Sequence, residues 1–214
     1  MPKVKAVLFD LDGTLRDTRD LIHDALDHTF RTHGLRVPSH EELKPYIHHH
    51  SFVQKQFAPE ISLEAFESTY GAQIDELLPY VQLYRDVEEV MRKVHELYKT
   101  AVVTAGKSAP REIPRYGLSP YVDVIVSATD ITKHKPDPEG VNLALDRLGV
   151  TPSHAVLIGD LATDIQAAKR AELAATVGIT HGFGSRDSLK KAGADYIIDS
   201  LAELPVALEA IEKA

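Results

Sequence analysis

Six short apolar segments recur along the chain, at residues 4–10, 100–106, 122–128, 154–160, 174–179 and 195–199. They are rich in valine and isoleucine, and apolar residues do not alternate with polar ones. Strands of a parallel sheet have this pattern because helices cover both of their faces. The segments are therefore predicted to be buried strands of one parallel sheet.

Amphipathic helical patterns separate these strands, at residues 86–98, 108–116, 138–148, 164–171, 185–192 and 201–212. Asp137-Pro138 predicts the start of one of them, with an acceptor at the N-cap and proline at the first helical position. Strands that alternate with helices predict an α/β fold. We expect a Rossmann-like, doubly wound core with a mainly parallel sheet.

Residues 18–82 break this alternation because they contain no convincing strand. Apolar side chains instead recur there at helical spacing, as in Leu21, Ala25, Leu26 and Phe30. Helices are predicted near 18–33, 39–50 and 62–79. The sequence thus predicts an all-helical cap domain, 18–82, inserted into a core made of 1–17 and 83–214.

Charge and composition narrow the possible partners. The 214 residues carry a formal net charge of −8 without a block of like charges, which disfavours binding to nucleic acid. The absence of cysteine excludes disulfides and thiolate chemistry. No apolar run approaches the ~20 residues of a membrane span, and the N-terminus lacks a signal-peptide pattern. A cytoplasmic protein with no membrane partner is expected.

The first predicted strand ends in two acids, Asp10 and Asp12, followed by Gly-Thr. Residues i and i+2 of an extended chain point to the same face, so both carboxylates can face one point beyond the strand. Ligands of open α/β sheets bind at this edge. Other predicted strands place further polar residues there, namely Thr104, Lys135, Asp160 and Asp164.

Several carboxylates in one pocket repel each other unless a cation compensates. Mg²⁺ suits such a site because it binds a few carboxylates and keeps water and phosphate as further ligands. With Lys135, it would keep Asp10 ionised as a nucleophile. Asp12 could then protonate the leaving oxygen and activate water. The pattern indicates metal-assisted phosphoryl transfer, in which Thr104 and the backbone N–H groups of Ala105 and Gly106 bind phosphate oxygens.

These motifs resemble those of the haloacid dehalogenase-like hydrolase superfamily, in particular phosphoglycolate phosphatase-like proteins with a helical cap. The matching segments are DLDGT at 10–14, Thr104, Lys135 in KPDP, and GDLATD at 159–164. The resemblance implies that Asp10 forms an aspartyl-phosphate and that Asp12 is the general acid and base. It also implies that Mg²⁺ is held by Asp10, the backbone carbonyl of Asp12, and Asp160, with Asp164 in or just outside the first shell.

Three features depart from the family pattern. Thr104 is followed by Ala-Gly where many relatives have asparagine, Arg16 stands at a usually apolar position, and YIHHHSF at 46–52 lacks an expected glycine. Arg16 could contact the substrate, as could Lys107 and Arg111 after the second motif. A small phosphorylated metabolite with a carboxylate would suit such cations, and phosphoglycolate is the first candidate.

Several alternatives stay open at this stage. A pyrophosphatase or a hexose-phosphate mutase would use the same core residues, and a phospho-acceptor regulatory protein would share part of them. Asp12 before Gly-Thr and the helical insertion favour an enzyme of the superfamily over a regulatory protein. His48, His49 and His50 could form a solvated face, contact the active site or bind a separate metal. The chain could be a monomer or a homodimer. Gly182 and Gly184 are expected in a flexible loop.

Overall fold

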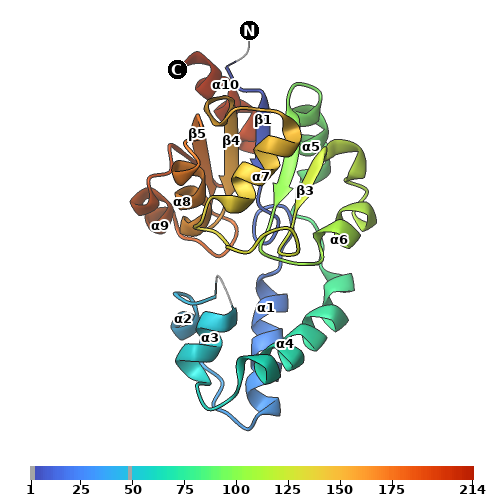
Figure 1. Ribbon diagram of the computed structural model, residues 1–214, viewed down its shortest axis with the longest axis vertical. Helices are drawn as coiled ribbons and strands as arrows, with labels where there is room; N and C mark the ends of the chain where they lie inside the picture. The colour runs from blue at the N-terminus through green and yellow to red at the C-terminus, as the bar shows by residue number, and fades with distance from the viewer. Residues whose placement is uncertain (1–2, 48–49) are drawn as a thin grey trace. The chain divides into compact units, whose positions relative to one another are not determined.

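The computed structural model describes residues 3–47 and 50–214. Its centre is a six-stranded parallel sheet with the order β3-β2-β1-β4-β5-β6 (Figure 1). All six predicted strands are present: β1 (Ala6–Phe9), β2 (Lys99–Val103), β3 (Val124–Val126), β4 (Ala155–Gly159), β5 (Ala175–Ile179) and β6 (Tyr196–Ile198). The chain runs outward from β1 to β3, then crosses back to β4. The doubly wound fold is thus confirmed, with its switch point beside β1.

Helices follow the strands as the sequence predicted. They are α5 (Val87–His95), α6 (Ala109–Arg115), α7 (Glu139–Leu148), α8 (Ala162–Arg170), α9 (Arg186–Ala192) and α10 (Leu204–Lys213), with short 3₁₀ turns η2 (Ser119–Tyr121), η3 (Pro152–His154) and η4 (Leu201–Glu203). The predicted start of α7 was wrong by one residue, because Pro138 occupies the N-cap. Asp137 still accepts a hydrogen bond from the Glu139 N–H at 3.0 Å. It therefore satisfies a donor of the first turn from one position further back.

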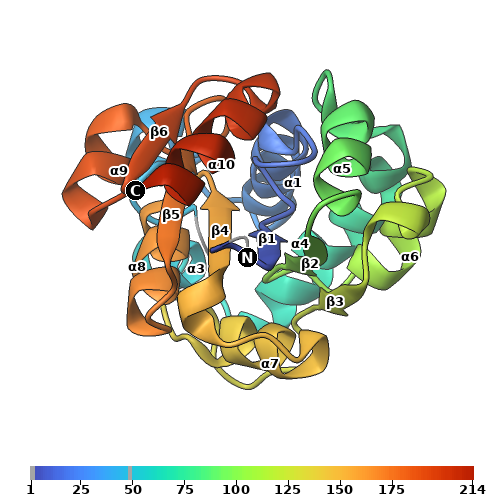
Figure 2. The ribbon, with the colours of Figure 1, turned by 90° about the horizontal axis from the view of Figure 1, so that it is seen from above.

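The sheet is buried on both faces, which explains its apolar strands. Val7 and Phe9 of β1 point into a core that α5 and α10 cover, whereas Ala6 and Leu8 point to the opposite face, which α7 and α8 cover (Figure 2). Side chains alternate between the two faces of a strand, so a strand between two helical layers has no polar face. The first polar residue after β1, Asp10, therefore stands at the end of the strand.

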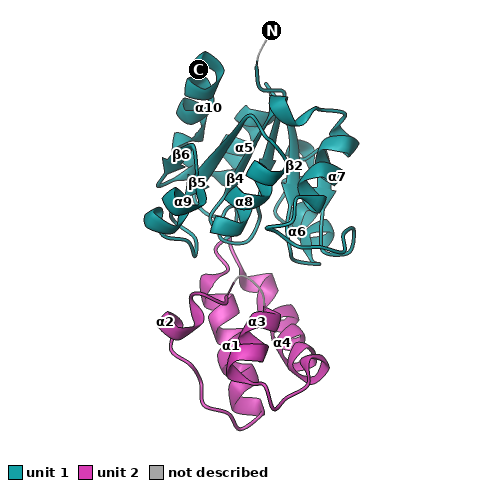
Figure 3. Cartoon of the chain, turned by 60° about the vertical axis from the view of Figure 1, so that its left-hand side comes forward, with its two compact units in different colours: residues 1–16, 83–214 teal, residues 17–82 magenta. Residues whose placement is uncertain are grey.

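The chain divides into two compact units, residues 1–16 with 83–214, and residues 17–82 (Figure 3). The sequence expectation placed the division one residue later, after Asp17. The second unit contains α1 (Arg19–Thr32), α2 (His40–Leu43), α3 (His50–Phe57), α4 (Leu63–Leu77) and the 3₁₀ turn η1 (Leu78–Tyr80). Its described residues form helices joined by turns and irregular segments, without a strand, as expected of the inserted cap domain.

The predicted helix at 39–50 was wrong. The α2 helix is a single turn that ends at Leu43, with a capping box between Ser39 and Glu42 at its start. Pro45 has no N–H to continue the helical hydrogen bonds, which explains why the helix stops there. The separate helix α3 was missed, and its Val53 side chain joins the core of this unit beside Leu26, Phe30, Leu43 and Phe66.

Among the described residues, we find no helix with the length and apolar character that a transmembrane span requires.

The central strand β4 provides a test of the sheet core. Leu157 is fully buried, whereas Leu97 is 73% exposed. Replacing Leu157 by alanine should leave a cavity and lower the free energy of unfolding by about 2–5 kcal/mol. The matched change Leu97→Ala should alter it by less than about 0.5 kcal/mol, as is usual at the surface. Urea unfolding of both variants measures the difference, and equal midpoints would contradict this description of the core.

Candidate active site

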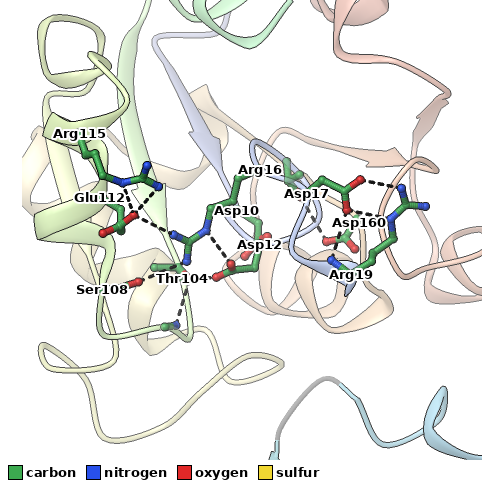
Figure 4. Close-up of polar contacts among 12 residues, drawn as sticks. Asp10, Asp12, Arg16, Asp17, Arg19, Thr104, Ser108, Glu112, Arg115 and Asp160 are labelled. Atoms are coloured by element: carbon green, nitrogen blue, oxygen red, sulfur yellow. Dashed lines mark hydrogen bonds and ion pairs between the residues drawn. The ribbon is translucent and has the colours of Figure 1, made fainter. Parts of the chain in front are cut away.

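The predicted site residues meet beyond the carboxyl ends of adjacent strands. Asp10 follows β1, Thr104 follows β2 and Asp160 follows β4. Because β1 lies between β2 and β4, these three positions stand side by side. Figure 4 shows Asp10, Asp12, Thr104 and Asp160 gathered around the loop that leaves β1. The topology thus places these predicted site residues at one shared edge of the sheet.

Three buried carboxylates form the centre of this site. One oxygen from each of Asp10, Asp160 and Asp164 lies within 4.8 Å of the others. The ammonium group of Lys135 lies 2.6 Å from Asp10 Oδ1 and also forms an ion pair with Asp164. It donates a further hydrogen bond to the Val103 carbonyl at 3.2 Å. Lys135 thus binds two of the three acids and fixes their spacing.

The charge on these groups is not balanced by Lys135 alone. Burial raises the pKa of Asp10 to about 7; Lys135 opposes this rise, and the negative charges of Asp164 and Asp12 add to it. Burial also raises the pKa of Asp160 well above its ordinary value, and Asp10 and Asp164 contribute in the same direction. For Lys135, burial lowers the pKa, but Asp10 and Asp164 outweigh that effect and the net shift is upward.

A divalent cation would relieve this repulsion and return the carboxyl groups to their ionised form. The donor set consists of buried carboxylate oxygens, which are the ligands that Mg²⁺ takes in proteins. Asp10, Asp160 and Asp164 therefore fit a metal of this kind.

Asp160 is held through both of its carboxylate oxygens. Thr14 Oγ1 donates to Oδ1 at 3.3 Å, and the backbone N–H of Phe183 donates to Oδ2 at 2.8 Å. The Thr14 hydroxyl belongs to the DLDGT motif, so one motif orients an acid of another. Asp160 is fully buried, and these contacts leave it little freedom to rotate.

Sequence reasoning missed the role of the loop after β5, which packs against the site. A Cβ on Gly182 would lie 2.2 Å from Asp160 Oδ2 and 2.4 Å from the Gly13 carbonyl oxygen. A Cβ on Gly184 would lie 1.8 Å from the Asp160 carbonyl oxygen. Only glycine fits at such distances. The two glycines therefore allow the backbone of this loop to approach the site closely. Two glycines two residues apart, shortly after a predicted strand, were the signal available in the sequence.

Asp164 is positioned by the first turn of α8. Its Oδ2 accepts a hydrogen bond from the Leu161 N–H at 2.9 Å, while Oδ1 faces Lys135. A Cβ on Gly159 would lie 2.4 Å from the Cβ of Asp164, so this glycine allows the helix to start close to the end of β4. The carboxylate thus accepts a hydrogen bond at the N-terminus of α8 and also takes part in the acidic cluster.

Asp12 differs from the other acids because its side chain is 25% exposed. Arg16 Nε donates to its Oδ1 at 2.8 Å, and Thr104 Oγ1 donates to its Oδ2 at 3.4 Å. The Gly106 N–H, predicted to bind phosphate, donates to Thr104 Oγ1 at 3.0 Å. Asp12 is therefore the acid of the site that is open to solvent while still being oriented by neighbours.

The predicted substrate contacts are not tested by these distances and stay predictions. Ala105 and Lys107 are exposed, and Arg111 pairs with Glu112 at 3.2 Å. The Arg16 side chain is only 3% exposed, and its contacts are with protein side chains.

The histidines of the helical unit are only partly described. His50 lies at the start of α3 and contacts Glu67 at 2.8 Å within its own unit. His48 and His49 lie outside the described residues.

Comparison with known proteins agrees with this geometry. Residues 7–177 match the family model of haloacid dehalogenase-like hydrolases. A Clostridium perfringens protein that carries the name of a pyrophosphatase, PpaX, is 35% identical over 225 aligned residues, which cover 98% of each chain.

Two solved structures share the fold over nearly the whole chain. A Lactobacillus plantarum protein described as a phosphoglycolate phosphatase has a TM-score of 0.85 at 19% identity, covering 96% of this chain and 99% of its own. A Thermotoga maritima protein described as a β-phosphoglucomutase has a TM-score of 0.72 at 25% identity, covering 97% and 99%. The family match includes all three acids of the cluster, Asp10, Asp160 and Asp164. This chain belongs to the haloacid dehalogenase-like hydrolase family.

Proposed function

We propose that this protein is a Mg²⁺-dependent phosphatase that hydrolyses a small phosphorylated metabolite through an aspartyl-phosphate on Asp10. The observation that carries this proposal is the pairing of Asp10 with Lys135 at 2.6 Å inside the buried cluster, with the more exposed Asp12 two residues further on. One acid is thus paired with a buried cation, and a second acid is accessible for proton transfer. Nucleophilic phosphoryl transfer needs both kinds of group.

In the first step, a carboxylate oxygen of Asp10 attacks phosphorus and the bond from phosphorus to the leaving oxygen breaks. Asp12, in its protonated form, gives its proton to that oxygen. Lys135 stabilises the ionised form of Asp10 before the attack and the negative charge of the transferring group during it. The products are the released alcohol or phosphate and an acyl phosphate on Asp10.

In the second step, Asp12 takes a proton from a water molecule as the water oxygen attacks phosphorus. The bond between phosphorus and the Asp10 oxygen breaks, which releases inorganic phosphate and restores both acids. Thr104 lies 3.4 Å from Asp12 and could bind a phosphate oxygen beside it. Bound Mg²⁺, held by Asp10 and Asp160 with Asp164 nearby, would neutralise charge on the phosphate oxygens.

The comparisons support pyrophosphate as the first substrate candidate, ahead of the phosphoglycolate that the sequence suggested. The relative with 35% identity carries a pyrophosphatase name, whereas the protein described as a phosphoglycolate phosphatase shares 19% identity and supports only the fold. A mutase remains the other enzymatic alternative, since a protein described as a β-phosphoglucomutase shares this fold. The net charge of −8 continues to argue against nucleic acid as a partner. A cytoplasmic monomer or homodimer stays our expectation.

The nucleophile is tested by Asp10→Asn, which keeps the side-chain shape but removes the attacking charge. Phosphate release should fall by roughly a thousandfold or more, as is typical when a covalent catalyst is lost. The matched control is Asp146→Asn on the exposed surface of α7, which should keep full activity. Retention of more than about a tenth of the activity by Asp10→Asn would exclude the aspartyl-phosphate mechanism.

The metal can be tested without any substrate. Mg²⁺ binds the folded cluster, so at a hundred times its dissociation constant it should add about 2.7 kcal/mol to the free energy of unfolding. Thermal unfolding with and without Mg²⁺ measures this effect. In Asp160→Asn the increase should largely disappear. An equal rise of the melting temperature in both proteins would place the metal elsewhere.

The substrate is tested by a phosphate-release screen with Mg²⁺ that includes pyrophosphate, phosphoglycolate and p-nitrophenyl phosphate. We expect the highest kcat/KM for pyrophosphate. Isomerisation of hexose phosphates, followed in parallel, separates a mutase from a hydrolase. A clear preference for phosphoglycolate would instead restore the sequence-based candidate, and isomerisation without phosphate release would identify a mutase.

A further inference from the structure

Arg16 is a buried cation in direct contact with the proposed acid and base. Its side chain is 3% exposed, and Nε donates to Asp12 Oδ1 at 2.8 Å (Figure 4). Its backbone is also tied to the same loop, because the Gly13 N–H donates to the Arg16 carbonyl at 2.9 Å. The guanidinium and the carboxylate it binds are therefore held on one short, closed segment.

The far side of the guanidinium is anchored to α6 and to the residue before it. Nη2 donates to Ser108 Oγ at 3.3 Å, and Nη1 lies 4.0 Å from Glu112 Oε2. Glu112 is itself buried and is ion-paired with Arg115 at 2.8 Å. Ser108 thus binds Nη2, and the negative charge of Glu112 attracts Nη1, which itself makes no hydrogen bond to the described residues. The guanidinium is therefore held on the side away from Asp12.

Stability alone does not account for an arginine here. Burying an ion pair carries a desolvation cost, and an apolar side chain of similar volume often stabilises a protein as well or better. Burial by itself lowers the pKa of Arg16, but Asp12 more than offsets that effect and the net shift is upward, so the guanidinium stays charged. Arg16 therefore keeps its charge in a buried position. Of its two ion-pair partners, Asp12 is the more exposed, at 25% of its side chain against 4% for Glu112.

We propose that Arg16 is a positioning residue for Asp12: anchored by Ser108 and Glu112, it holds the Asp12 carboxylate where it exchanges protons with the leaving oxygen and with water. This inference rests on the proposed phosphatase function. Of the two oxygens of Asp12, Oδ1 is bound by Arg16, while Oδ2 lies toward Thr104 at 3.4 Å. Fixing one oxygen orients the other, and proton transfer depends on such alignment.

The two chemical steps depend on Asp12 in different ways, which makes the inference testable. Cleavage of an alkyl phosphate requires Asp12 to protonate the departing alkoxide as the bond from phosphorus to oxygen breaks. Cleavage of p-nitrophenyl phosphate releases a stable phenolate that departs without this proton. Hydrolysis of the aspartyl-phosphate requires Asp12 to accept a proton from water with either substrate.

The experiment compares wild type, Arg16→Met and Asp12→Asn on β-glycerophosphate and on p-nitrophenyl phosphate. For Arg16→Met, kcat/KM for β-glycerophosphate should fall by about 10- to 100-fold, the scale of a misplaced catalytic group. For p-nitrophenyl phosphate, kcat/KM should stay within about threefold while kcat falls and a burst of nitrophenol shows that aspartyl-phosphate accumulates. Asp12→Asn should show the same pattern more strongly.

The ratio of the two kcat/KM values does not depend on the fraction of folded enzyme, so a loss of stability cannot imitate the result. Arg147→Met is the matched control. Arg147 pairs with Asp130 at 2.8 Å and is 39% exposed, so it takes no part in the contacts that hold Arg16 and its ratio should equal that of wild type. If Arg16→Met does not fold, Arg16→Lys keeps the buried charge without the Nε–H donor, and its ratio should shift in the same direction.

Equal losses on both substrates, or an unchanged ratio, would overturn the inference. A rise of KM confined to phosphoglycolate would also overturn it, because β-glycerophosphate has no carboxylate and that result would identify Arg16 as a substrate contact. Failure of the proposed function gives a different result. In that case wild type and Asp10→Asn would release equal, background amounts of phosphate from every substrate.

Discussion

The repulsion among Asp10, Asp160 and Asp164 is the constraint on which the rest of the site depends. Three carboxyl groups are buried with oxygens within 4.8 Å of one another, and Lys135 is the cation that binds two of them. Burial, together with the neighbouring negative charges, raises the pKa of Asp10 to about 7. The positive charge of Lys135 alone does not compensate the three acids. The site favours a divalent cation and an anionic group whose own charge that cation can neutralise.

The surrounding structure holds these acids in place at close quarters. The backbone N–H of Phe183 and the Thr14 hydroxyl bind Asp160, and Gly182 and Gly184 let the loop after β5 approach without a clash. Such contacts fix the direction of the Asp160 carboxylate before any ligand binds. Preorganisation of this kind is what an electrostatic site needs, because reorienting the groups during the reaction would cost free energy.

Asp12 is oriented by a different means. Its carboxylate is partly exposed, and Arg16 connects it to the buried Glu112 of α6. The acid that exchanges protons is thus tied to the core through Arg16, whereas the nucleophile is tied to it through Lys135. In the function proposed here, this separation keeps the two acids of one motif, only two residues apart, in distinct electrostatic surroundings.

The sequence by itself determined the succession of strands and helices along the chain, the parallel sheet, and which acids follow its strands. Apolar runs that end in Asp10, Thr104 and Asp160 are local signals, because burial on both faces leaves few polar positions inside a strand. Only the tertiary structure decided that Arg16 faces Asp12 and Glu112, and that Gly182 and Gly184 pack against Asp160. Arg16 and Asp12 are only four residues apart, but the turn that brings them together and the contacts to Glu112 and Asp160 depend on residues distant in sequence, on which local patterns carry no information. Pro45 signals a helix break in the sequence, but the helical spacing of apolar residues around it led to the prediction of one continuous helix.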